Sequence, residues 1–372
     1  MATANSVTII SDKYLNQMRL ECDPLADDAV LAAVRCHGER VLKCHELYST
    51  IKELGETYED PSCARFLEFY EHEPPWNVDW EKCDSGRRFF VRNSAIAGLV
   101  LMYCSLVKSF TAAFGNKVLT AMGRMTAYGD VRRRLFETLH FVKEVVLGAP
   151  GDIKAECMRV RLLHAAVRYY VQHHDNRWEV EKYGYPINQE DLAGTLSTFS
   201  SVVLRGLELL GVMATDSEKC GYQQLWKFVG YYLGTENDLL CNSYEEEKNL
   251  SDLISSRQCN PDKDSLLLTE SLLQAFASKY PFHLSYDTTS KLSRHLINDK
   301  ELANKLHLRT FGLFGQATMT LCYVFLRLFA VIQRILYPVE WVMYAFGKYS
   351  LKSLVELSLN GRKPSYLMKA HS

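Results

Sequence analysis

The segment "VRLLHAAVR" (160–168) places one histidine between two arginines in apolar surroundings. In an α-helix, Arg161, His164 and Arg168 fall at i, i+3 and i+7 and therefore share one face. Two cations beside an imidazole disfavour its protonation, so we expect a neutral His164 ring with a nitrogen free to bind a metal. One ligand that carries two anionic groups would account for both arginines. The segment therefore suggests a haem, with its iron on His164 and its propionates near Arg161 and Arg168.

A second set of polar side chains lies in the helix expected just before this one, "VRRRLFETLHFVKEVV" (131–146). Arg134, Thr138 and Phe141 fall at i, i+4 and i+7, so a guanidinium, a hydroxyl and an aromatic ring share a face. Such a set can bind a propionate or an iron-bound oxygen, while the ring lines a cavity. We therefore expect Arg134 and Thr138 to contribute to catalysis, and Arg134 also to cofactor binding.

Composition narrows the class of protein. The 372 residues carry a formal net charge of −1, so no overall field favours nucleic acid. Eleven cysteines without a CxxC pair indicate a reducing compartment. The start "MATANSVTII" lacks the pattern of a secretory signal, so we expect a cytoplasmic protein, with membrane association left open. No CxxCH occurs, which excludes covalent c-type haem attachment.

The elements that position these residues are predicted to be helices almost throughout, with no alternating strand pattern. The sequence indicates three regions: an N-terminal helical extension (1–60), a cofactor-binding core (61–240) and a C-terminal helical region (241–372). The expected helices span about 25–54, 93–107, 130–147, 152–174, 186–211 and 220–234.

The most hydrophobic long run is 312–346, which Arg327, Gln333 and Arg334 interrupt. One interpretation is a membrane-contacting hairpin, with Trp341 and Tyr344 at the interface. The other is a core helix pair packed on the rest of the domain. We favour the core pair, because the charges break the run and no basic flank orients it.

Several segments, taken in order, carry a family resemblance: "PPWNVDWEKCDSGRRFF" (74–90), "RRRLFETLHF", "VRLLHAAVR", "YPINQEDLAGTLSTF" and "LWKFVGYYLG". Over about 66–240 they resemble the catalytic domain shared by rubber oxygenase (latex-clearing protein) and the endoplasmic-reticulum-bound oxygenase of mycophenolic acid biosynthesis.

The resemblance implies an all-α, globin-like multi-helix bundle around a non-covalent b-type haem. It also implies cleavage of isoprenoid C=C bonds with dioxygen as co-substrate. By position, His164 matches the family's proximal histidine, and Arg168, Arg134 and Thr138 match family residues. Rubber oxygenase has a lysine just before that threonine, able to bind the distal iron; this chain has Glu137.

We therefore expect a haem-dependent oxygenase that acts on a hydrophobic, isoprenoid-like or lipid-like substrate. The alternative is a catalytically silent haem-binding or lipid-binding helical protein associated with a membrane or partner. A di-iron site at Glu137-x-x-His140 is disfavoured, because the sequence offers no second copy of that motif. The pair His173-His174 is interpreted as surface, since consecutive residues do not share a helix face.

Overall fold

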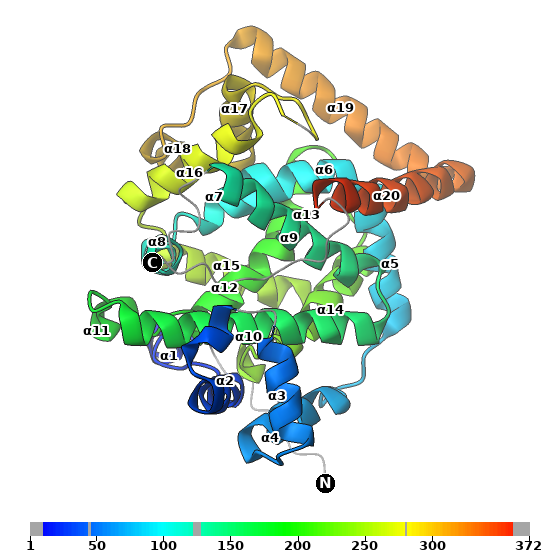
Figure 1. Ribbon diagram of the computed structural model, residues 1–372. Helices are drawn as coiled ribbons and strands as arrows, with labels where there is room; N and C mark the ends of the chain where they lie inside the picture. Colours follow the sequence, from blue (N-terminus) through cyan, green and yellow to red (C-terminus); the bar gives the residue numbers. More distant parts are fainter. Residues whose placement is uncertain (1–9, 44–45, 122–127, 280, 360–372) are drawn as a thin grey trace.

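The computed structural model describes all residues except 1–9, 44–45, 122–127, 280 and 360–372 (Figure 1). Its described residues form helices joined by loops, with no β-strand among them, so the predicted all-α fold is confirmed. The first half contains α1 (Asp12–Met18), α2 (Pro24–His37), the 3₁₀ helix η1 (Glu39–Lys43), α3 (Leu47–Glu56), α4 (Pro61–Glu71), α5 (Trp80–Arg92), α6 (Ser94–Val100), the π-helix η2 (Leu101–Ser105), α7 (Leu106–Ser109), α8 (Ala113–Ala121), α9 (Tyr128–Leu147) and α10 (Pro150–His174). The second half contains α11 (Val180–Tyr183), α12 (Gln189–Phe199), α13 (Ser201–Leu209), α14 (Asp216–Tyr232), the 3₁₀ helix η3 (Asn237–Leu239), α15 (Tyr244–Gln258), α16 (Lys263–Phe276), α17 (Tyr286–Ile297), α18 (Lys300–Lys305), α19 (Leu313–Ile335) and α20 (Tyr337–Ser358).

Side-chain caps determine where the helices around the site begin. The first backbone N–H groups of a helix lack partners within the helix, and a capping side chain supplies one. At the start of α10, Pro150 occupies the first turn and Asp152 accepts a hydrogen bond from the Ala149 N–H at 3.0 Å. At α14, Thr215 and Glu218 cap each other's backbone reciprocally.

Two stretches predicted as continuous helices are broken. The stretch 25–54 ends its first helix at Gly38, whose φ of +71° is a left-handed conformation that glycine adopts without strain. The stretch 186–211 breaks at Ser200 between α12 and α13. There the Ser200 hydroxyl and the Ser201 N–H both donate to the Glu247 carboxylate, at 3.0 Å each. The break is therefore stabilised by a residue far along the chain.

Helices α5 and α14 pack with their backbones in close approach. A Cβ at Gly86 would overlap the backbone of Tyr222, and a Cβ at Gly221 would overlap the carbonyl of Lys82. The Phe90 and Tyr222 rings stack beside this contact, with centroids 5.6 Å apart. Glycine at both positions therefore allows the two helix axes to approach closely.

One hydrophobic core cluster draws buried residues from Ala26 to Leu351, and therefore from all three regions predicted from the sequence. Helix α10 crosses the molecule through this cluster, with α2, α3 and α4 on one side of it and α9 and α12 on the other (Figure 1). The division into an extension, a core and a C-terminal region stays a prediction.

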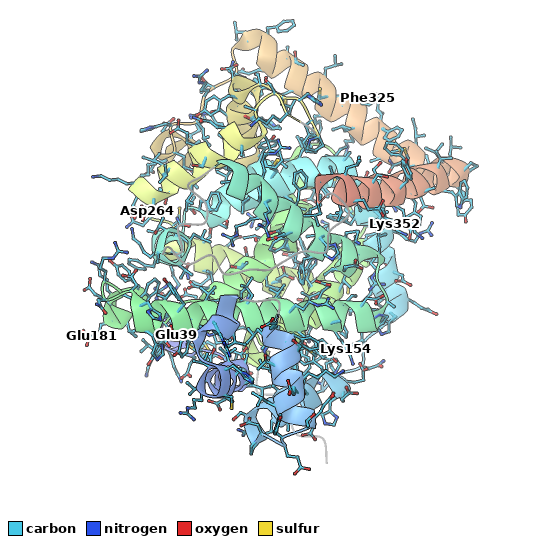
Figure 2. The ribbon with its side chains drawn as sticks, in the orientation of Figure 1. Glu39, Lys154, Glu181, Asp264, Phe325 and Lys352 are labelled. Carbon is cyan, nitrogen blue, oxygen red and sulfur yellow. The ribbon has the colours of Figure 1, made fainter. Side chains whose placement is uncertain are left out.

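The C-terminal hairpin, defined here as α19 and α20, differs from the expected core helix pair. Only Ala330 and Gln333 of α19 are buried, and α19 runs along the outer edge of the molecule (Figure 1). Helix α20 packs on α5 at Gly347, where a Cβ would overlap the carbonyl of Val91. The core-pair interpretation is therefore wrong for α19 and correct only for one face of α20. In Figure 2, Phe325 lies on the outer side of α19.

Candidate functional site

A cavity of about 1210 Å³ lies among the segment 94–119, α9, α10, α12 and α20. Its wall is largely apolar, as expected for a site that holds a hydrophobic ligand. The volume exceeds the roughly 300–1,000 Å³ of common small-molecule pockets. Wall residues include Leu135, Phe141, Val160, Leu163, Trp226 and Leu354. The π-helix η2 contributes Leu101, Met102 and Ser105.

His164 lies on the face of α10 that lines this cavity. Its Nδ1 atom is buried and has no hydrogen-bond partner among the described residues. Burial lowers the pKa of His164 to about 4, and the positive charges of Arg168 and Arg134 act in the same direction against Asp23. The expectation of a neutral ring is confirmed, but burial contributes more than the neighbouring cations do.

Arg134, Thr138 and Phe141 all line the cavity from α9, as their spacing predicted. The Thr138 hydroxyl donates to the Arg134 carbonyl at 3.0 Å, so its lone pairs remain available to accept a hydrogen bond. A cation, a hydroxyl acceptor and an imidazole therefore border the same space.

Arg161 and Arg168 lie on the same face of α10 as His164, but their side chains are directed toward α2. Arg161 donates to both carboxylate oxygens of Asp23, with Nε–Oδ2 at 2.6 Å and Nη2–Oδ1 at 2.8 Å. Arg168 donates to Asp27 at 2.7 Å and to the Ile187 carbonyl at 3.3 Å. Neither arginine lines the cavity. The structure therefore places Arg134 and His164 together, and Arg161 and Arg168 in ion pairs beside them.

Glu137, which stands where the resemblance expects a lysine, lies at the cavity wall and forms an ion pair with Arg133 at 3.2 Å. His140, from the disfavoured di-iron motif, lies 3.7 Å from both Glu144 and Glu156. Within the described ranges, no group of three or more His, Cys, Asp or Glu is placed to hold a metal ion.

The two consecutive histidines lie on the surface, as predicted. His173 is exposed and stacks on Tyr169 with ring centroids 4.0 Å apart. His174 lies 2.9 Å from the exposed carboxylate of Glu39. Neither histidine lines the cavity.

Asp191 is a cavity residue that the sequence did not single out. It lies in the first turn of α12, where "NQED" was interpreted only as an acidic helix start. Burial raises the pKa of Asp191 to about 6, against the opposing charge of Arg19. Gln258 donates to its carboxylate at 3.2 Å. A carboxyl whose pKa is raised by burial is therefore part of the cavity wall.

Comparisons with known proteins agree with this architecture. A family model described as "ER-bound oxygenase mpaB/B'/Rubber oxygenase, catalytic domain" matches residues 94–338. A solved structure, described as "Structure of Latex Clearing Protein LCP in the closed state", is similar at a TM-score of 0.69 and 18% sequence identity. The similarity covers 89% of this chain and 91% of that chain, and at this identity it shows the fold. A comparison with curated proteins finds no match.

The family match begins and ends later than the 66–240 expected from sequence segments, and reaches the start of α20. It includes α9 and α10 with Arg134, Thr138 and His164. Since it spans 245 of the 372 residues, the chain belongs to the family of the ER-bound oxygenase and rubber oxygenase catalytic domain.

Proposed function

We propose that this chain is a haem b-dependent oxygenase acting on a hydrophobic, isoprenoid-like substrate, with His164 as the iron ligand. The observation that best supports this proposal is a neutral imidazole on the wall of a large apolar cavity. Its buried Nδ1 atom has no hydrogen-bond partner among the described residues. Neutral imidazole is a common haem ligand, and a cavity of about 1210 Å³ has room for more than one small molecule. The residues present therefore fit a haem.

Haem, when bound, supplies the redox chemistry with dioxygen. The protein's part is to bind, orient and exclude water. Arg134, a permanent cation on the cavity wall, suits a propionate carboxylate. Thr138 can accept a hydrogen bond from a polar group held between α9 and α10. The apolar wall excludes water and favours an alkene substrate over a polar one.

Arg161 and Arg168 act in this proposal as positioning residues. Their ion pairs with Asp23 and Asp27 fix α10 against α2 and so fix where His164 projects. The charge of Arg168 also disfavours protonation of the ring, which keeps the nitrogen lone pair available.

The test is haem binding by the purified protein, followed by dioxygen uptake. Wild-type protein should show a Soret band at one haem per chain, and His164→Ala should lose the haem or its spectrum. His173→Ala is the matched control, because His173 is an exposed histidine on the same helix. Dioxygen consumption with an isoprenoid that contains internal double bonds then tests the reaction. A protein that stays colourless after haem is added contradicts the proposal, and a haem protein that consumes no dioxygen with such substrates contradicts the oxygenase assignment.

A further inference from the structure

The outer face of the C-terminal hairpin carries many exposed apolar side chains. We define this outer face by the exposed apolar residues of the segment 313–346 that are named below. In α19 the most exposed are Leu313 and Phe314, each 87% exposed. The other apolar residues of the outer face are Leu321, Val324, Phe325, Leu328, Val331, Ile332, Ile335, Leu336, Trp341, Val342 and Phe346. Large exposed apolar patches on a protein mark sites that bind another protein, a membrane or an apolar ligand.

The charges that interrupt this hydrophobic run do not lie on the outer face. Segment 313–346 contains three charged residues, Arg327, Arg334 and Glu340. Arg327 and Arg334 both reach Met213 in the body, and Arg334 also lies 3.5 Å from Glu218. Glu340 is held by Arg88 at 2.8 Å. Each of the three is therefore tied to a residue outside the hairpin, and Arg327 is also exposed to solvent.

The rim of the outer face has the composition of a membrane interface. Tyr337 and Tyr349 are each 70% exposed and Trp341 is 58% exposed, and such rings favour the headgroup level of a bilayer. Lys348 and Lys352 follow on α20, both exposed, with no ion-pair partner among the described residues. Exposed lysines beside an apolar surface are complementary to anionic headgroups. The exposed Glu356 lies one turn further on.

The cavity reaches this same hairpin. Phe346, Tyr349 and Leu357 line the cavity and are also more than half exposed to the outside. Side chains that belong to both surfaces mark an opening of the cavity along α20. A second copy of the chain seated on the outer face would cover this opening, whereas a bilayer would leave it facing acyl chains.

We infer that the outer face of α19 and α20 docks on an anionic lipid bilayer and that hydrophobic substrate passes from the bilayer into the cavity along α20. The proposed bilayer contact is argued only from the exposed side chains of the hairpin and does not depend on the proposed function. The passage of substrate rests on the proposed function, because it names the membrane as the source of the oxygenase's substrate. Helix α19 lies flat against the body through Ala330 and Gln333 in this arrangement, with its other side in the lipid.

The first experiment measures sedimentation of the full-length protein with vesicles of phosphatidylcholine and phosphatidylserine. The test variant is Leu321→Asp/Phe325→Asp/Leu328→Asp, and the matched control is Leu20→Asp/Tyr58→Asp/Leu267→Asp, three exposed apolar residues outside the hairpin. The test variant should lose vesicle affinity by about tenfold or more, and the control should not. K348E/K352E should weaken binding to anionic vesicles without changing binding to pure phosphatidylcholine.

Circular dichroism of each variant shows whether a loss of vesicle binding is due to misfolding. The haem content of each variant shows separately whether the proposed function fails. Wild-type protein that binds haem but does not sediment with vesicles overturns the inference. If the wild-type protein does not bind vesicles but dimerises with rising concentration, and the three aspartates abolish this dimerisation, the outer face binds a second copy of the chain. That result also overturns the inference. Vesicle binding by a protein that binds no haem would leave the membrane contact intact and reject the oxygenase.

The passage along α20 has its own readout in Trp226, which lines the cavity. A brominated long-chain alkene dissolved in the vesicles should quench Trp226 fluorescence, identified by difference from Trp226→Phe. In the three-aspartate variant the quenching should slow by about tenfold or more, in proportion to lost vesicle binding. Equal quenching rates in the variant and the wild type overturn the passage.

Discussion

Arg161 and Asp23 form a two-pronged ion pair in the interior, where 5% of the arginine side chain and 3% of the aspartate side chain are exposed. The same carboxylate lies 3.7 Å from Arg168, so one aspartate at the N-cap of α2 compensates two guanidinium groups on α10. A carboxylate shared in this way is a constraint on both the stability and the position of the helix that carries His164.

We predict that Asp23→Asn lowers the free energy of unfolding by about 3–5 kcal/mol, because it leaves buried cations without their counter-charge. Denaturant unfolding measures this loss. Asp27→Asn is the control: its side chain is 31% exposed, so water compensates part of the change and the loss should be smaller. Equal losses in the two variants would contradict the shared role of Asp23.

The buried His164 ring predicts a specific pH dependence. The pKa is about 6.5 in the unfolded chain and about 4 in the folded protein, so the unfolded state takes up the proton first as the pH falls. The free energy of unfolding is therefore unaffected by this group above pH 6.5. It falls by about 3 kcal/mol as the pH is lowered from 6.5 to 4. Urea unfolding of haem-free wild type and His164→Gln over this range measures it. Parallel curves for the two proteins would show that the ring is not buried as a neutral group.

Removal of the Arg134 charge should loosen the cofactor. A hydrogen bond to a charged group contributes about 1.5–3 kcal/mol, so Arg134→Gln should release haem about tenfold faster or more. Transfer of haem to an apo-globin in excess measures the rate. Arg132→Gln is the matched control, since Arg132 lies in the same basic run but donates to the Ala275 carbonyl and packs over Phe276. Identical rates of haem release in the two variants would show that Arg134 does not bind the haem.

Glu137 allows a test of the departure from rubber oxygenase. Glu137→Lys places an amine on the cavity wall beside Arg133 and Arg134, whose charges favour its neutral form. We expect the haem spectrum of this variant to change to that of iron with a second nitrogen ligand. Glu137→Gln, which also removes the ion pair with Arg133, should keep the wild-type spectrum. The same spectrum in both variants would show that position 137 does not reach the iron.

Helical spacing correctly identified the residues of the cavity wall on α9 and α10. Arg134, Thr138 and His164 line one cavity because the 3.6-residue period is a local property of the chain. The same period grouped Arg161 and Arg168 with His164, yet these two face α2. Their partners, Asp23 and Asp27, are 138 and 141 positions away, and no local pattern reports a partner at that distance.

The hairpin shows a second limit of local reasoning. Arg327 and Arg334 counted against a membrane contact because they interrupt the hydrophobic run. Seven residues apart, they occupy the same side of α19, and that side is turned to Met213. The sequence shows how many charged residues the segment contains. The direction in which each charged side chain points depends on contacts with residues elsewhere in the chain, and only the folded structure shows those contacts.

The glycine contact between α5 and α14 brings together two helices that both form ion pairs with the hairpin. Helix α5 carries Arg88, which holds Glu340, and α14 carries both Glu218, beside Arg334, and the cavity residue Trp226. A Cβ at Gly86 or Gly221 would overlap the opposite backbone, so the two helices are close-packed at this point. The hairpin is therefore tied by ion pairs to two close-packed helices, one of which carries a residue of the cavity wall.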